Sequence, residues 1–303
     1  MLVKTYSSTL CGIFSTTITI EVNLGTGINF YLVGLPDNAV KESHQRIKSA
    51  LKNNALKFPG REITINMAPA DIKKEGTVFD LPIAIGILAV SQQVRIEKLK
   101  DYLMIGELSL DGSLQNCKGI LPRVLQARKE GFKGIIVPEM NYHEAQLVDD
   151  IHVIPVSNIK EVINFLNLNQ IPEIKNPKSQ NNEVKECVDF KDVQGQFQVK
   201  RAFEIAAAGG HNLILIGPPG SGKSMMAKRM PDILPPMSID EALETTSLYS
   251  VSNKVDFHGS LILQRPFRKP HHTASDVAIV GGGGIPKPGE ISLAHNGVLF
   301  LDE

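Results

Sequence analysis

The feature that most constrains the fold of this chain is the stretch GPPGSGKS at residues 217–224, directly after the apolar run Leu213–Ile216. It fits the pattern G-x-x-x-x-G-K-[ST], which belongs between a buried strand and a helix. Gly217, Gly220 and Gly222 let backbone N–H groups turn toward a phosphate without Cβ clashes. An ordinary Gly/Pro-rich turn between a strand and a helix has no need of Gly-Lys-Ser at this register. The stretch therefore predicts a phosphate-binding loop.

The side chains at the end of this loop predict a nucleotide with its metal ion. Lys223 would reach the β- and γ-phosphates, and the Ser224 hydroxyl would ligate Mg²⁺. A helix expected from about Lys223 to Met230 would point its positive end at the anion. We therefore expect ATP and Mg²⁺ as ligands. The expected nucleotide-binding residues are Gly217, Pro218, Pro219, Gly220, Ser221, Gly222, Lys223 and Ser224.

A second motif, which is acidic, lies at the end of the sequence. The apolar run Val298–Leu301 resembles a strand covered on both faces, and it is followed by Asp302 and Glu303. Ligands of parallel sheets lie beyond the carboxyl ends of the strands, so Asp302 would hold Mg²⁺ there. Glu303 would act as the general base on the attacking water, making Glu303 and Lys223 the expected catalytic residues. The alternative is an acidic strand end that only meets solvent; pairing with the loop at 217–224 favours the catalytic interpretation.

Composition limits the class of protein. A length of 303 residues suggests two domains, and 42% hydrophobic with 21% charged residues is typical of a soluble globular protein. The formal net charge is zero, so contact with nucleic acid would have to come from local basic patches. We find no apolar stretch of membrane-spanning length and no secretory signal. Cys11, Cys117 and Cys187 are widely spaced, which suits a reducing cytoplasm and predicts no metal site.

A polar segment from about Asn167 to Glu186, with two prolines and no apolar period, predicts an interdomain linker. We accordingly expect domains at residues 1–168 and 189–303, joined by a linker at 169–188. Periodicity in the first domain predicts a mixture of strands and helices, hence an α+β or α/β fold. The expected strands lie at 18–22, 29–33, 62–67, 102–105, 134–137 and 151–154, and the expected helices at 37–51, 79–90, 121–129 and 159–166. In the second domain we expect an alanine-rich helix at 197–208, ended by Gly209-Gly210.

Several stretches together resemble one family. They are YLVGLPDNAVKES (31–43), GTVFDLPIAIG (76–86), FKDVQGQ (190–196), AAAGGHNLILIGPPGSGKS (206–224), RPFRKPHHTAS (265–275) and GGGGIPKPGEISLAHNGVLFLDE (281–303). These stretches are similar to the magnesium-chelatase-like AAA+ ATPases of the YifB/ComM competence-protein type. The resemblance implies an α/β protein with a Lon-protease-like α+β N-terminal domain, followed by a P-loop AAA+ domain with a parallel sheet. It also implies a homo-hexameric, ATP-driven DNA motor of the bacterial cytoplasm, acting in branch migration during natural transformation.

The sequence departs from the family pattern in two ways. It ends at Glu303, before the family's arginine finger and sensor residues, so we expect a C-terminally truncated fragment that binds ATP and hydrolyses it inefficiently. Lon-type proteolysis uses a Ser–Lys dyad, but the nucleophile-like loop offers Thr77, Val78 and Asp80, and Leu121 stands where the lysine is expected. An acylating nucleophile needs a hydroxyl beside a base. We therefore expect a non-proteolytic N-terminal domain, used for assembly or DNA contact.

Basic residues near the C-terminal end are candidates for DNA or subunit contact. Arg268 and Lys269 lie in a proline-bracketed stretch, and Lys287 follows four glycines in a segment that could project toward a central pore. The alternatives are a solvated basic loop and a hairpin packed on its own domain. His271 and His272 lack further ligands at zinc-like spacing. Two other functions stay open: a metal-chelatase-type ATPase subunit and a non-catalytic nucleotide-binding remnant. The missing Ser–Lys dyad argues against a third, an ATP-dependent protease.

Overall fold

The protein is described here by a computed structural model, which describes residues 1–173, 189–252, 260–282 and 287–302. The chain divides into two compact units, the first containing residues 1–173 and the second nearly all described residues from 189 onward. No helix among the described residues is long and apolar enough to cross a membrane.

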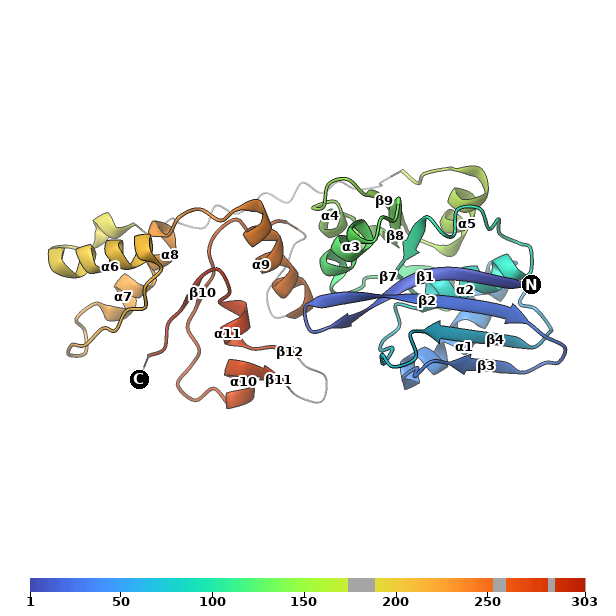
Figure 1. Ribbon diagram of the computed structural model, residues 1–303, viewed down its shortest axis with the longest axis horizontal. Helices are drawn as coiled ribbons and strands as arrows, with labels where there is room; N and C mark the ends of the chain where they lie inside the picture. The colour runs from blue at the N-terminus through green and yellow to red at the C-terminus, as the bar shows by residue number, and fades with distance from the viewer. Residues whose placement is uncertain (174–188, 253–259, 283–286, 303) are drawn as a thin grey trace. The chain divides into compact units, whose positions relative to one another are not determined.

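A seven-stranded mixed sheet forms the centre of the first unit, in the order β3-β4-β2-β1-β5-β8-β9 (Figure 1). Strands β1, β2 and β4 pair antiparallel, whereas the β3–β4, β1–β5, β5–β8 and β8–β9 pairs are parallel. The strands are β1 (Leu2–Cys11), β2 (Phe14–Leu24), β3 (Phe30–Val33), β4 (Ile63–Ala68), β5 (Tyr102–Met104), β8 (Gly134–Pro138) and β9 (His152–Val156), and a separate ribbon joins β6 (Glu107–Leu108) to β7 (Leu114–Gln115). This unit is therefore a mixed α/β structure, and each of its predicted strands is present.

Strand β1 was not predicted, although it pairs with β2 along its whole length. The hairpin turn contains Gly12 at φ 61°, a backbone conformation that glycine adopts without strain. The inward positions of β1 include Thr5 and Ser7, whose small polar side chains hide the apolar alternation that identifies a strand. Thr5 Oγ1 satisfies its buried hydroxyl by donating to the carbonyl of Pro82 at 3.0 Å.

Helix α1 (Asn38–Asn53) begins as the sequence predicts. The Asp37 side chain accepts a 2.8 Å hydrogen bond from the Val40 N–H, the usual arrangement of an N-cap. The apolar positions Ile47 and Leu51 are fully buried and form the core-facing stripe of this helix.

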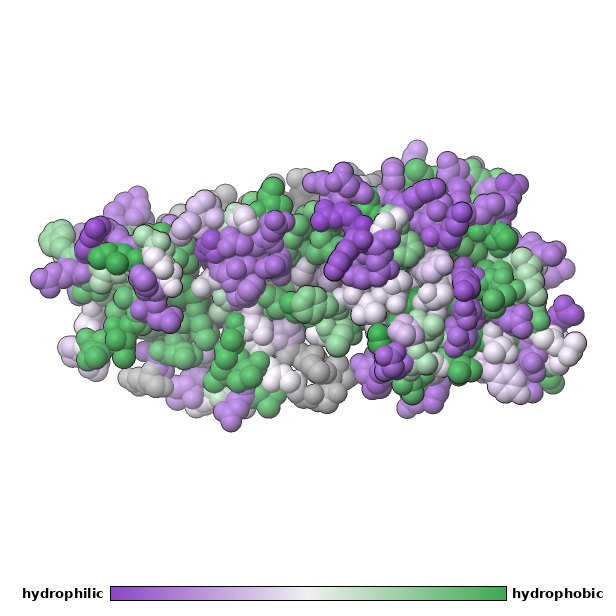
Figure 2. All heavy atoms as spheres, viewed as in Figure 1, coloured by the Kyte–Doolittle hydropathy of each residue, from purple (hydrophilic) through white to green (hydrophobic). Residues whose placement is uncertain are grey.

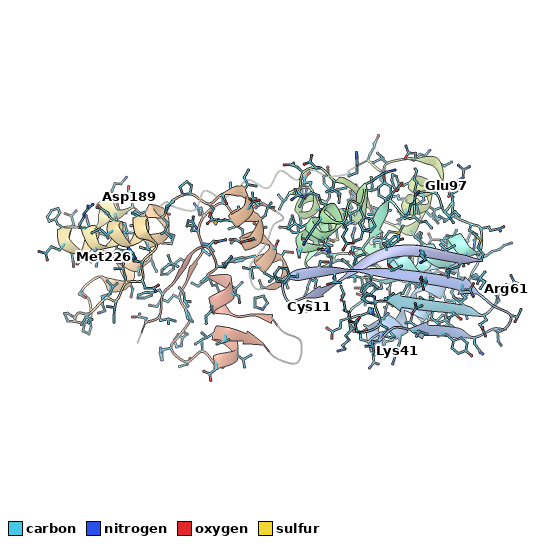
Figure 3. The ribbon with its side chains drawn as sticks, in the orientation of Figure 1. Cys11, Lys41, Arg61, Glu97, Asp189 and Met226 are labelled. Atoms are coloured by element: carbon cyan, nitrogen blue, oxygen red, sulfur yellow. The ribbon has the colours of Figure 1, made fainter. Side chains whose placement is uncertain are left out.

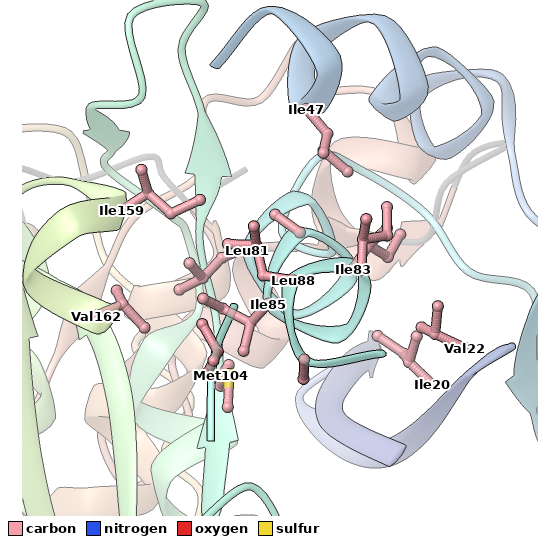
Figure 4. Close-up of a cluster of buried hydrophobic side chains, with 14 of the residues drawn as sticks. Ile20, Val22, Ile47, Leu81, Ile83, Ile85, Leu88, Met104, Ile159 and Val162 are labelled. Carbon is pink, nitrogen blue, oxygen red and sulfur yellow. The ribbon is translucent and has the colours of Figure 1, made fainter. Parts of the chain in front are cut away.

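Helix α2 (Asp80–Val90) is buried at every position, which explains why it is apolar all round. Figure 4 shows its side chains between those of β2, α1 and α5 (Ile159–Leu168). A Cβ atom on Gly86 would lie 2.7 Å from Val22 Cγ2, so glycine allows the helix to approach the sheet closely. The remaining helices of the unit are η1 (Glu139–Asn141), α3 (Ile120–Lys129) and α4 (Tyr142–Ala145).

An ion pair links α1 to the buried start of α2. Arg46 Nε and Nη2 donate to the two Asp80 carboxylate oxygens at 2.7 and 2.9 Å, and Nη2 also donates to the Ala39 carbonyl. Burial raises the pKa of Asp80, while the Arg46 hydrogen bonds oppose that rise. A buried carboxylate is tolerated only when it is paired in this way, so Arg46 fixes the position of the first turn of α2.

The second unit is built on helices with short strand pairs. A small core contains Val193, Phe203, Ala206, Met226 and Met230. The Phe190 ring packs on the Phe203 ring, with 5.5 Å between the ring centroids. Figure 3 labels Met226 of this core, together with Asp189. The helices are η2 (Phe190–Asp192), α6 (Phe197–Gly209), α7 (Lys223–Ala227), α8 (Met230–Ile233), α9 (Ile239–Ser252), α10 (Asp276–Val280) and α11 (Glu290–Leu293), and the strands are β10 (Phe267–Arg268), β11 (Gly281–Gly282), β12 (Lys287–Pro288) and β13 (Val298–Leu299).

Three expectations for this unit were wrong. The strand expected at Val298–Leu301, covered on both faces, is limited to the two half-buried residues of β13, and Leu301 is 66% exposed. Residues 211–218 form no strand, because this segment pairs with no other strand in the described part of the chain. Leu215 contacts the core, but Ile214 and Ile216 are 85% and 90% exposed where a buried strand was predicted. Figure 2 shows hydrophobic and hydrophilic atoms intermixed on the surface of this unit. The helix expected from Lys223 to Met230 is also divided into α7 and α8.

Candidate functional site: a phosphate loop beside an acidic strand end

The loop at residues 217–224 has the backbone form that its glycines predict. Gly220 and Gly222 have φ of 78° and 87°, in the left-handed region that favours glycine. Helix α7 begins directly afterwards and has only five residues, so its dipole is weaker than that of the longer helix expected. A phosphate bound here would therefore rely mainly on the loop N–H groups and on the side chains of Lys223 and Ser224.

Lys223 lies over its own loop. Its Nζ donates to the carbonyls of Gly217 at 2.7 Å and Pro218 at 3.0 Å. These contacts hold the ammonium above the turn formed by the glycines. A phosphate in the loop would replace the carbonyls with charged acceptors, which make stronger hydrogen bonds.

Gln196 is a site residue that sequence analysis missed. It has φ of 56°, precedes α6, and donates from Nε2 to the Ser221 carbonyl at 3.2 Å. The stretch FKDVQGQ contains it, but no spacing rule assigned it a contact. Gln196 therefore ties the start of α6 to the phosphate loop.

Arg229 anchors the other side of the loop–helix segment. Its Nε donates to the Asp189 carbonyl at 2.8 Å, its Nη1 to the Met225 carbonyl at 3.0 Å, and its Nη2 lies 3.3 Å from Asp192 Oδ2. The Arg229 side chain is largely buried. Short helices gain little stability from their own backbone, so this anchoring positions α7.

Ser224 and Asp302 lie side by side, which is the arrangement that a shared metal ion would need. Ser224 Oγ donates to Asp302 Oδ2 at 3.4 Å. Asp302 reaches this position because β13 pairs in parallel with β10, with Phe267 opposite Val298 and Arg268 opposite Leu299. The segments that follow both strands consequently leave the same edge of the pair.

Lys269 follows β10 and reaches the same carboxylate. Its Nζ lies 2.7 Å from Asp302 Oδ2 and 5.3 Å from the centre of the Phe300 ring. The hydrogen bond from Lys269 lowers the pKa of Asp302, and Ser224 and Lys223 lower it further. Asp302 is therefore held as a carboxylate, the form that binds a cation.

The oxygen donors fit Mg²⁺. This ion prefers oxygen ligands and usually takes one or two from the protein, with water and phosphate oxygens completing an octahedron. Ser224 Oγ and Asp302 Oδ2 are such donors. No cluster of three or more His, Cys, Asp or Glu that could cage a metal occurs among the described residues. Ser224 and Asp302 would therefore hold Mg²⁺ together with water and the phosphate oxygens of a ligand.

Two of the three basic residues expected to face DNA have partners within the unit. Arg268 Nε lies 2.6 Å from Glu290 Oε2, and its side chain is 26% exposed, so its charge is used inside the fold. Lys269 is paired with Asp302, as described above. Lys287 begins β12, but its side chain lies outside the described part, as does Glu303.

In the protease-like loop of the first unit, the hydroxyl group has a carboxylate partner where a Ser–Lys dyad would provide a lysine. The Thr77 hydroxyl donates to Glu107 Oε2, and Leu121 is fully buried in α3. A carboxylate is a much weaker base than the amine of a dyad lysine. This geometry does not provide the usual activation of an acylating hydroxyl.

Comparison with known proteins relates both units to one group. A family model described as magnesium chelatase, subunit ChlI, matches residues 189–303, and a second, described as subunit ChlI of Mg-chelatase, matches residues 20–141. The chain is 48% identical to the competence protein ComM of Haemophilus influenzae over 98% of its length and 59% of the relative's. It is 46% identical to YifB of Escherichia coli over 96% of its length and 57% of the relative's.

The chain thus spans less than two thirds of the length of these relatives. A more distant similarity, 29% identity over 54% of this chain and 21% of the relative, connects it to a Lon protease of Endomicrobium trichonymphae. That similarity is distant and partial, and it agrees with a Lon-like relationship.

Proposed function

Since this chain belongs to the YifB/ComM-type magnesium-chelatase-like family, we propose that its second unit binds ATP with Mg²⁺ as the ATPase part of a DNA-remodelling motor. The observation that carries the proposal is the contact between Ser224, at the end of the phosphate loop, and Asp302, beyond β13. Two oxygen donors from distant parts of the sequence meet beside a loop built for phosphate.

The loop, Asp302 and Glu303 have separate roles in this proposal. The backbone N–H groups of residues 217–224 surround the phosphates, and the ammonium of Lys223 binds the β- and γ-phosphates. Ser224 and Asp302 hold Mg²⁺, whose charge would draw electron density from the γ-phosphate. Glu303 accepts the proton of the attacking water as general base.

The activity of the whole protein is proposed from its relatives. One relative is named a competence protein, and we infer that the longer protein moves branched or single-stranded DNA during transformation or recombination. A homo-hexamer in the bacterial cytoplasm is the assembly we expect, because ring ATPases complete each site with an arginine from the neighbouring subunit. The Lon-like first unit would then serve assembly or DNA contact.

Calorimetry with MgATP tests the nucleotide site. Lys223→Ala removes a charge-assisted phosphate contact worth roughly 1.5–3 kcal/mol, so affinity should fall roughly 10- to 150-fold. Lys228→Ala is the matched control, because Lys228 is exposed near the end of α7 and contacts neither the loop carbonyls nor Asp302 in the described contacts. Equal MgATP affinity of the wild type and Lys223→Ala would show that this lysine does not bind phosphate.

The motor proposal is tested on a protein that has the full length of these relatives. MgATP should drive strand movement on a labelled forked duplex, and Glu303→Gln should abolish that movement while nucleotide binding persists. A protein that turns over ATP without acting on any branched or single-stranded DNA would contradict the proposal.

A metal-chelatase-type subunit is the second candidate, because the family model matching residues 189–303 is described by that activity. It predicts ATP turnover that is coupled to insertion of a metal ion, with no response to DNA. Nucleotide binding without turnover in the longer protein would instead favour a non-catalytic role.

A further inference from the structure

Asp302 Oδ2 has two donors in the structure, and one of them is a cation. Ser224 Oγ lies 3.4 Å from this oxygen, whereas Lys269 Nζ lies closer, at 2.7 Å. The Lys269 and Asp302 side chains are 39% and 32% exposed, so both groups are also accessible to solvent ions.

The position of Lys269 is fixed from two sides. Parallel pairing of β10 with β13 brings the residue after β10 to the acidic end of β13. The Phe300 ring lies beneath the ammonium and stacks on Phe267 at 6.2 Å. An ammonium over an aromatic face is attracted to it, which favours the observed arrangement over a freely mobile side chain.

We propose that Lys269 competes with Mg²⁺ for Asp302, so that Asp302 binds the metal effectively only when nucleotide phosphates supply the other ligands. This inference rests on the proposed function of the site. A divalent cation and an ammonium on one carboxylate oxygen repel each other, so binding of the metal displaces Lys269. Lys269 is thus a positioning residue that couples metal binding to nucleotide binding.

The test uses Mn²⁺ as the probe, with free Mn²⁺ measured by electron paramagnetic resonance, in the presence and absence of ADP. Exposed ion pairs contribute about 0.2–1 kcal/mol, so Lys269→Met should tighten Mn²⁺ binding without nucleotide by about 1.4- to fivefold. Lys269→Arg keeps the cation and should behave like the wild type. Lys228→Met removes the same charge away from Asp302 and should leave Mn²⁺ affinity unchanged.

A double-mutant cycle separates competition at Asp302 from a general charge effect. If Lys269 acts through Asp302, Lys269→Met should have no effect on Mn²⁺ binding in the Asp302→Asn background. Persistence of the effect in that background, or unchanged Mn²⁺ affinity in Lys269→Met, overturns the inference. Failure of ADP to raise Mn²⁺ affinity in the wild type would instead contradict the proposed nucleotide site, so the two failures are distinguishable.

Discussion

Ser224 Oγ and Asp302 Oδ2 are joined by a 3.4 Å hydrogen bond although 78 positions separate them in the sequence. The contact connects a phosphate loop to the acidic end of a two-residue strand. Motif spacing alone can propose such a pair, but only the parallel pairing of β10 with β13 brings Asp302 to the loop.

Ser224→Ala should weaken nucleotide binding in the presence of Mg²⁺ and leave metal-free binding nearly unchanged. Losing one hydroxyl ligand that also bonds Asp302 should cost about 1–2 kcal/mol in the metal-dependent term. Titration of ADP with Mg²⁺ and with EDTA separates the two conditions. Ser224→Thr, which keeps the hydroxyl, is the control, and an equal loss in EDTA for Ser224→Ala would show that Ser224 has no metal-linked role.

Arg268→Ala should lower stability and leave DNA binding unaffected. The variant removes one partner of Glu290, a partly buried charge-assisted bond worth about 1–3 kcal/mol in urea unfolding. The slope of log affinity against log salt for forked DNA should match that of the wild-type longer protein, because a lost phosphate contact would change it by about 0.9. A shallower slope would return Arg268 to the DNA-contacting residues, and Lys287→Ala is the comparison.

Gly34→Ala should destabilise the first unit. Gly34 has φ of 104°, and a Cβ atom there would lie 2.2 Å from the Met67 carbonyl oxygen in β4. Backbone strain and overpacking together should cost about 2–5 kcal/mol, measured by urea unfolding. Gly60→Ala is the control, since a Cβ at Gly60 meets nothing within 4 Å. Equal stability of the two variants would contradict the close approach of β3 to β4.

The cysteines Cys11 and Cys117 should react with iodoacetamide at very different rates. Cys11, at the end of β1 (Figure 3), is exposed, whereas burial raises the pKa of the Cys117 thiol to about 11. Peptide mapping at pH 8 should therefore find alkylation at Cys11 long before Cys117, because the thiolate is the reactive form. Similar rates would show that the region around Cys117 opens readily.

The same raised pKa predicts how stability depends on pH. An unfolded chain releases the thiol proton at lower pH than the folded one, so the stabilising contribution of Cys117 is complete below about pH 8.5. It is lost as the pH rises toward 11. Cys117→Ala should show a smaller loss of stability over that interval, and identical slopes would contradict the assignment.

Much of the first unit could be predicted, because its strands and helices carry clear periodicity. The Asp37 cap and the apolar face of α1 follow local rules. Strand β1 could not be predicted in this way, since its buried threonines and serines hide the alternation. Asp80 was noted only at a protease-like position, and its partner Arg46 depends on how two helices pack, which no local pattern encodes.

The candidate site was predictable in its residue types and less so in its contacts. Glycine positions and the Lys–Ser pair follow from the chemistry of phosphate binding. Arg268 and Lys269 showed charge in the sequence, but their ion-pair partners lie more than twenty positions away. Gln196 carries no distinctive spacing and could be assigned only from its contact with Ser221.

The parallel pairing of β10 and β13 also bears on how this region could vary in length. Lys269 and Asp302 are aligned by two neighbouring strands, whereas the β11–β12 hairpin belongs to the excursion between them. Lengthening the segment between β10 and β13 should leave Lys269 and Asp302 aligned, because the entropic cost of loop closure grows only slowly with loop length. Glycine–serine insertions of increasing size after residue 284 should therefore preserve Mg²⁺-dependent ADP affinity, and a steady loss with length would show that the hairpin itself supports the site. Insertions in this hairpin would then change the surface that the unit presents to a partner, while Ser224 and Asp302 keep their positions.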